Sequence, residues 1–192
     1  MMLGEVPGPL PRRTRISRRL KGVGCRVAEW DRRLSARMTL SQKARLRRKG
    51  AALGAHLGDS ILWIVLASLT FLLGTETARQ MVAIGTLAVI ASAGSVTLVK
   101  PLARRKRPEG DVSGHFFWNR FDRYSFPSGH AARTASIAVV VGLSYPNFAT
   151  PFYFLPFVVG FSRIALGIHY LSDILAGLAI GFLLAWMVVT VL

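Results

Sequence analysis

Residues 80–99 read QMVAIGTLAVIASAGSVTLV, a stretch of 20 residues without a charged side chain. As an α-helix, a stretch of this length is about 30 Å long, which is the thickness of the hydrocarbon core of a bilayer. Residues 174–192, ILAGLAIGFLLAWMVVTVL, add 19 more uncharged residues. A helix of a soluble bundle has a polar face, whereas these two stretches have none. They therefore predict helices that cross a membrane.

Three shorter apolar segments lie around these two stretches and complete an all-α prediction. We place five helices at about residues 57–74, 80–99, 130–144, 150–167 and 173–192. The predicted fold is a multi-pass transmembrane helical bundle of about five spans with a basic N-terminal segment. We expect two parts, a tail of residues 1–58 and a membrane domain of residues 59–192.

The composition combines hydrophobicity with an excess of positive charge. Hydrophobic residues make up 52% of the chain and the mean hydropathy is +0.40, yet 25 Lys and Arg against 9 Asp and Glu give a net charge of +16. Such hydrophobicity excludes intrinsic disorder of the whole chain. The single cysteine, Cys25, excludes an internal disulfide. A basic nucleic-acid binder and a membrane protein with a basic face remain.

The basic residues are concentrated in the tail. Residues 1–58 contain 15 of the Lys and Arg and only three acidic residues. Prolines 7, 9 and 11 predict an extended start. From Arg26 to Met38, apolar residues recur at helical spacing with arginines on the other faces, which predicts a basic amphipathic helix. Its apolar residues are Val27, Trp30, Leu34 and Met38.

The positions of the basic segments predict an orientation and a partner. Five spans place the tail and the loops at 100–130 and 163–173 on one side, and the positive-inside rule makes that side cytoplasmic. Anionic lipid is the expected partner of the tail, because basic residues beside a span are attracted to anionic headgroups. Nucleic acid is the weaker candidate, since only Trp30 offers a ring for base stacking.

Three short motifs lie in the loops on that side, and the first is KPLARRKRP at residues 100–108. Cations where a span leaves the membrane commonly form a patch that contacts lipid headgroups. Alternatively, Lys100 and Arg107 are two helical turns apart, point the same way and bind one phosphate. In that case Lys supplies a point charge and Arg a planar fork.

The second motif, FPSGH at residues 126–130, opens the third span. It is compatible with a turn that only caps a helix. Alternatively, the Ser128 hydroxyl and the backbone N–H groups of the helix start form an anion site. His130 would then lie beside the anion, with a pKa range suited to proton transfer near neutral pH.

The third motif is Ser162-Arg163, five residues, His169, three residues and Asp173. A histidine followed by an acid at this spacing is often a pair at the start of a helix. Alternatively, an acid at a membrane boundary needs a partner, and His169 is the nearest one. A carboxylate on one imidazole nitrogen would leave the other nitrogen as a nucleophile or base.

Together, the three motifs resemble those of the type 2 phosphatidic acid phosphatase (lipid phosphate phosphatase) superfamily over residues 100–173 and the flanking spans. The resemblance implies a phosphatase that forms a phosphohistidine intermediate with no metal ion and no cofactor. It implies a nucleophile, an orienting carboxylate and a general acid at His169, Asp173 and His130. The implied ligands of the phosphoryl oxygens are Lys100, Arg107, Ser128, Gly129 and Arg163. Vanadate-dependent haloperoxidases share this constellation, but they are soluble and larger.

An extended match favours one substrate class. The sequence DRYSFPSGHA at residues 122–131, followed by Arg133, is similar to the branch that acts on polyisoprenoid phosphates and diphosphates. Phosphatidic acid and phosphatidylglycerophosphate are the alternative substrates. The aromatic residues 116–118 fit either an interfacial belt or an entry for a prenyl chain. A silent membrane scaffold is disfavoured, because the histidines and the acid of the site are all present.

Overall fold

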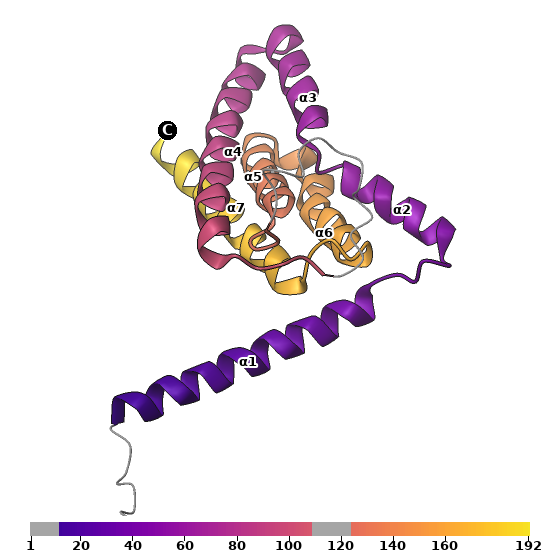
Figure 1. Ribbon diagram of the computed structural model, residues 1–192. Helices are drawn as coiled ribbons and strands as arrows, with labels where there is room; N and C mark the ends of the chain where they lie inside the picture. Colours follow the sequence, from indigo (N-terminus) through magenta and orange to yellow (C-terminus); the bar gives the residue numbers. More distant parts are fainter. Residues whose placement is uncertain (1–11, 109–123) are drawn as a thin grey trace, which may run out of the picture.

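The computed structural model describes residues 12–108 and 124–192, and every regular element in these two ranges is helical. The predictions for the prolines at 7, 9 and 11 and for the aromatic residues 116–118 lie outside the described residues. The elements are α1 (Arg12–Met38), α2 (Arg45–His56), α3 (Ser60–Leu73), α4 (Glu76–Ala103), α5 (Gly129–Ser144), the 3-10 turn η2 (Pro146–Phe148), α6 (Ala149–Ala165) and α7 (Leu171–Val191) (Figure 1). The all-α prediction is confirmed.

Helices α3 to α7 correspond to the five predicted helices, with ends that differ by a few residues. Helix α4, the stretch Pro146–Ala165 and α7 are long and apolar enough to cross a membrane. The pair α2 and α3, bent by 45° at the break between them, makes a possible fourth crossing. Helix α5 has only 16 residues, so the count of five spans stays a prediction.

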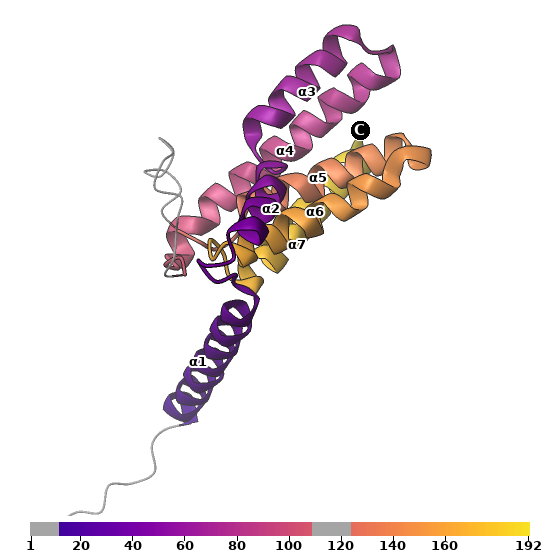
Figure 2. The same cartoon turned by 90° about the vertical axis from the view of Figure 1, so that its right-hand side faces the viewer.

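Helix α5 is the centre of the bundle, with α4, α6 and α7 around it (Figure 1). Nine of its residues are buried, and most of them are Ala, Ser, Thr or Gly. Small side chains let neighbouring helices approach closely, which is how helices pack in a membrane where lipid is as apolar as protein. By contrast, α3 has no buried residue, and it forms an outlying hairpin with the first half of α4 (Figure 2).

Close packing of α5 against α7 brings the starts of these helices together. A Cβ atom added at Gly177 would collide with the carbonyl oxygen of Ser128, and one added at Gly181 would collide with that of Ala132. Deeper in the bundle, the Ser136 hydroxyl lies 3.1 Å from the carbonyl oxygen of Gly181 and 3.2 Å from the hydroxyl of Ser92. These contacts fix the two helix starts that carry the second and third motifs.

The N-terminal helices contact the bundle at their ends or along one side. The C-terminal end of α1 reaches α6 and α7, while the rest of α1 extends away from the bundle (Figures 1 and 2). The predicted amphipathic helix is thus the end of a longer one. Asp31 and Ser35 of this end are buried, whereas Val27 and Trp30 are 60% and 64% exposed. Helix α2, which the sequence did not predict, packs along α6.

Candidate active site

The loop between α6 and α7 brings His169 to the start of α7. After α6, the amide of Ile168 donates to the carbonyl oxygen of Arg163 at 2.9 Å, which closes a tight turn. Gly167 in this turn has a φ of +75°, a left-handed conformation that glycine adopts without a steric cost. The chain therefore reverses within a few residues and buries His169, which is 1% exposed.

Asp173 contacts both His169 and the first turn of α7. Its Oδ2 atom lies 3.4 Å from Nδ1 of His169 and accepts a hydrogen bond from the amide of Tyr170 at 2.9 Å. One side chain therefore makes both contacts that the spacing suggested, one at the helix start and one to the histidine. Asp173 caps the start of its own helix and also contacts one imidazole nitrogen of His169, leaving Nε2 for other chemistry.

The surroundings of His169 keep its imidazole neutral near pH 7. Burial lowers the pKa to about 4, and the positive charges of Arg163 and Arg107 act in the same direction. The hydrogen bond to Asp173 opposes these effects without cancelling them. A neutral imidazole retains the lone pair that a nucleophile needs.

The three predicted cations converge on this pair. Lys100, near the end of α4, interacts electrostatically with Arg107, Arg163 and Asp173. Arg163 is buried at the end of α6. Three like charges at close range repel one another, and a bound anion with several oxygens relieves that repulsion. The cluster is therefore suited to a phosphoryl group.

The second motif begins α5 as predicted, with Ser128 as its N-cap. The Ser128 hydroxyl accepts from the amide of Ala131 at 3.5 Å, and the Ser128 amide donates to the carbonyl oxygen of Asp173 at 3.0 Å. The Ser128 amide is thus used to join α5 to α7. Gly129 is the first residue of α5. The second motif therefore lies at the start of this helix, next to the third motif.

His130 lies between a guanidinium and a carboxylate. Nη2 of Arg163 lies 2.9 Å from Nδ1 and 3.0 Å from Nε2 of His130. On the other side, Oδ1 of Asp59 lies 3.2 Å from Nε2. Asp59, at the break between α2 and α3, also lies 2.6 Å from Nδ1 of His56. The sequence did not single out Asp59; the one signal that could have found it is that an acid beside an apolar span needs a partner.

A second contact that the sequence did not predict involves Arg105, within the first motif. Its Nη1 atom lies 2.9 Å from Oδ1 of Asp173, and its Nη2 atom lies 2.5 Å from Oδ2 of Asp31. The spacing of the motif singled out Lys100 and Arg107, and nothing in it distinguishes Arg105 from the basic residues on either side.

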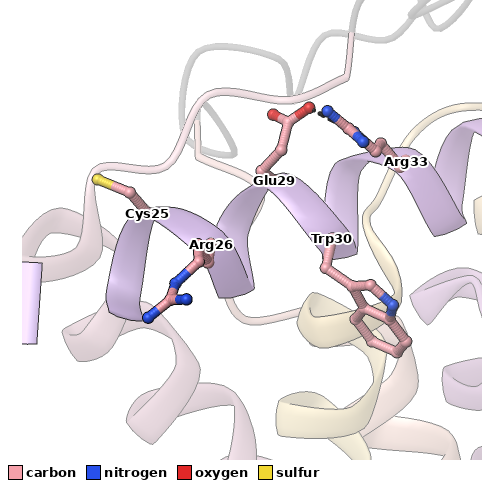
Figure 3. Close-up of a pocket in the computed structure, with 5 residues that line it drawn as sticks. All are labelled: Cys25, Arg26, Glu29, Trp30 and Arg33. Carbon is pink, nitrogen blue, oxygen red and sulfur yellow. Dashed lines mark hydrogen bonds and ion pairs between the residues drawn. The ribbon is translucent and has the colours of Figure 1, made fainter. Parts of the chain in front are cut away.

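Two hollows in the described residues lie away from this cluster. One, of about 390 Å³, is on the exposed side of α1 and is lined by Cys25, Arg26, Glu29, Trp30 and Arg33. Figure 3 shows Glu29 and Arg33 pointing toward each other there, with Trp30 on the opposite side of the helix. The other, of about 410 Å³, lies between α2 and α6. In the described residues, no three His, Cys, Asp or Glu side chains are grouped closely enough to hold a metal.

The fold and the site together define a helical membrane protein with a buried histidine–carboxylate pair among cations. Comparison with known proteins agrees: the PAP2 superfamily model matches residues 81–192, and the chain belongs to this family. The predicted resemblance and the predicted membrane location are thereby confirmed.

Two relatives of known activity are similar to this chain over part of its length. The chain is 33% identical over 128 residues to the decaprenylphosphoryl-5-phosphoribose phosphatase of Mycobacterium tuberculosis, over 66% of this chain and 70% of that protein. It is 32% identical over 98 residues to the lipid A 1-phosphatase of Rhizobium etli, over 48% of this chain and 42% of that protein.

A solved structure shares the fold. The transmembrane PAP2 type phosphatidylglycerolphosphate phosphatase of Bacillus subtilis superposes with a TM-score of 0.65. The superposition covers 86% of this chain and 85% of that one, at 24% sequence identity. At this identity the likeness concerns the architecture alone.

Proposed function

We propose that this chain is an integral membrane phosphatase that removes the phosphate or diphosphate of a membrane lipid through a phosphohistidine intermediate, without a metal ion. The observation that carries the proposal is the buried pair of His169 and Asp173 within the field of three cations. Phosphoryl transfer depends mainly on positioning and on compensating the charge of three oxygens, and this site offers both.

In the first step, His169 attacks the phosphorus atom. The Nε2 lone pair forms the N–P bond while the bond from phosphorus to the lipid oxygen breaks. Asp173 accepts a hydrogen bond from Nδ1–H and stabilises the positive charge that develops on the ring. Lys100, Arg107, Arg163, Ser128 and Gly129 hold the phosphoryl oxygens.

His130 transfers the protons of both steps. As a general acid it protonates the lipid oxygen that leaves. Burial and the positive charge of Arg163 disfavour its protonated form, while the contact with Asp59 and the negative charge of a bound phosphate favour it. In the second step His130 takes a proton from water as the water attacks phosphorus. The N–P bond then breaks, inorganic phosphate leaves and His169 regains its lone pair.

A polyisoprenyl phosphate or diphosphate is the favoured substrate. Support comes from the residues around the second motif and from the similarity to a decaprenylphosphoryl-5-phosphoribose phosphatase. Phosphatidic acid and phosphatidylglycerophosphate remain the alternative substrates. A silent scaffold is disfavoured because the side chains needed for turnover are brought together.

For the topology, we propose five spans with the N-terminus and the site on the cytoplasmic side. The membrane domain comprises residues 59–192, and residues 1–58 form a basic tail that contacts anionic lipid and not nucleic acid. Exposed Val27 and Trp30 beside exposed arginines support this, because such a helix lies well at the surface of an anionic leaflet.

Phosphate release by the purified full-length protein tests the proposal. Prenyl monophosphate, prenyl diphosphate, phosphatidic acid and phosphatidylglycerophosphate are offered in excess EDTA, with His169→Ala as the control. We expect release that survives EDTA, is blocked by orthovanadate and is highest with a prenyl substrate. A requirement for added magnesium contradicts the mechanism, and an inactive protein on all four lipids contradicts the assignment as an enzyme.

A further inference from the structure

Asp31 is a buried carboxylate on the helix that otherwise extends away from the bundle. It is 4% exposed and lies on the C-terminal half of α1, where that helix meets the start of α7. A buried carboxylate is costly unless charged or polar groups surround it. The groups that surround Asp31 belong to the catalytic end of the bundle.

Two of these groups are backbone and side-chain donors of α7. The amide and the hydroxyl of Ser172 donate to Asp31 at 3.0 and 2.6 Å. One turn further along α1, the hydroxyl of Ser35 accepts from the amide of Leu171 at 2.9 Å. The first amides of a helix have no partner within it, so α1 supplies acceptors that cap the turn carrying Asp173.

The third group is Arg105, which joins Asp31 to Asp173. Its two terminal nitrogens lie 2.5 Å from Asp31 and 2.9 Å from Asp173, and its guanidinium carbon lies 3.9 Å above the ring of Tyr170. The planar guanidinium therefore bridges two carboxylates while an aromatic ring restricts its tilt. One of these carboxylates contacts the predicted nucleophile.

We infer that Asp31 and Arg105 are positioning residues for catalysis, so that the N-terminal helix completes the active site. Arg105 holds Oδ1 of Asp173, which directs Oδ2 toward His169. Asp31 binds the other terminal nitrogen of Arg105 and compensates the positive charge of the guanidinium. The negative charge of Asp173 is then available to stabilise the imidazole of His169. This inference rests on the proposed function and adds to it a role for a segment outside the matched family region, residues 81–192.

The charge state of Asp31 agrees with this role. Burial alone would raise the pKa of its carboxyl, but the hydrogen bonds from Ser172 and Arg105 outweigh burial and lower the pKa below its usual value. Asp31 is therefore ionised at neutral pH and available to compensate the guanidinium.

The decisive variant is Asp31→Asn, which keeps the shape and removes the charge. In the full-length protein we expect kcat to fall about tenfold with KM within about twofold, because Asp173 loses alignment and lipid binding is untouched. The loss is expected to be equal for a prenyl phosphate and for p-nitrophenyl phosphate, because the step affected is nucleophilic attack and not protonation of the leaving group.

Matched variants separate positioning from docking of the helix. Glu29→Gln makes the same chemical change on the exposed side of α1 and should leave kcat unchanged. Ser35→Ala weakens the docking of α1 without touching Arg105, and should retain kcat within about twofold even if the melting temperature falls. Arg105→Gln should lower kcat like Asp31→Asn, and the double variant should lose little more than either single one.

The outcomes distinguish this inference from the proposed function. If the wild-type protein turns over and Asp31→Asn or Arg105→Gln keeps its kcat, the inference is overturned. A loss in Ser35→Ala as large as in Asp31→Asn also overturns it, because docking would then explain the effect. An inactive wild-type protein contradicts the proposed function instead. Should Asp31→Asn fail to fold, Arg105→Gln decides alone.

Discussion

The carboxylate of Asp59 lies 3.2 Å from Nε2 of His130, across the junction between the α2–α3 break and the start of α5. The same junction is held by Arg133, which donates to the carbonyl oxygen of Gly58 at 2.6 Å. His130 thus has a carboxylate partner from a distant part of the chain, whereas the carboxylate partner of His169 is Asp173, four residues further along the chain. Arg163 lies close to both histidines: its Nη2 atom lies 2.9 Å from Nδ1 of His130, and its carbonyl oxygen lies 3.4 Å from the amide nitrogen of His169.

Asp59→Asn should impair protonation of the leaving group. The amide cannot stabilise an imidazolium as a carboxylate does, so we expect turnover of a prenyl phosphate to fall about tenfold or more. p-Nitrophenyl phosphate needs little protonation of its leaving group, so its turnover should fall much less. Equal losses on both substrates would contradict a role for Asp59 through the general acid. His56→Gln, which removes the other partner of Asp59, is the matched control.

His169→Ala should abolish turnover, and Asp173→Asn should reduce kcat by about 100-fold or more while the protein stays folded. The Asn oxygen can still accept from the amide of Tyr170, so the helix cap is retained. Rapid-quench labelling with a ³²P-labelled substrate should trap a phosphoenzyme that is stable in base and labile in acid. If the His169→Ala variant still forms this phosphoenzyme, His169 is not the nucleophile.

The pH dependence of stability should report the buried His169. Its pKa is about 4 in the folded protein, whereas an unfolded histidine titrates near about 6.5. Between these values the unfolded state binds more protons, so stability falls as the pH is lowered from about 6.5 to 4. Melting temperatures of the wild type and His169→Gln are compared from pH 7.5 to 4.5. The variant should show a shallower fall, and parallel curves would show that His169 is not buried in its neutral form.

Helices α3 to α7 and the three motifs were predictable because their signals are local. Uncharged stretches predicted the helices, and the spacing of histidines, acids and cations predicted the candidate site. Arg105 was not predictable, because its role depends on where the chain turns after α4. Arg104 adopts a φ of +46° and ends that helix, which directs Arg105 toward Asp31 and Asp173. The partners of Asp31 and Asp59 are likewise fixed by tertiary contacts that leave no pattern in the sequence.

Labelling of Cys25 tests the orientation of the membrane domain. It is the single cysteine of the chain and is exposed on α1, so it reports without background. We expect a membrane-impermeant maleimide to label it only after the cells are permeabilised. Labelling in intact cells would place the tail, and with it the active site that α1 contacts, on the outer side. Cys25→Ser provides the blank.

Gly181→Ala tests whether contact between α5 and α7 holds the site together. An added methyl group would meet the backbone of Ala132, and backbone cannot move aside as a flexible side chain can. We expect a loss of about 1–3 kcal/mol in stability, as for other overpacked interfaces. Gly94→Ala is the matched control, because a Cβ there meets nothing within 4 Å and alanine favours a helix by about 1 kcal/mol. Since α7 carries Asp173 and α5 carries His130, Gly181→Ala should also lower kcat, while Gly94→Ala should not. Unfolding in detergent and phosphate release measure the two effects, and an equally stable, equally active Gly181→Ala protein would show that this packing does not position the site.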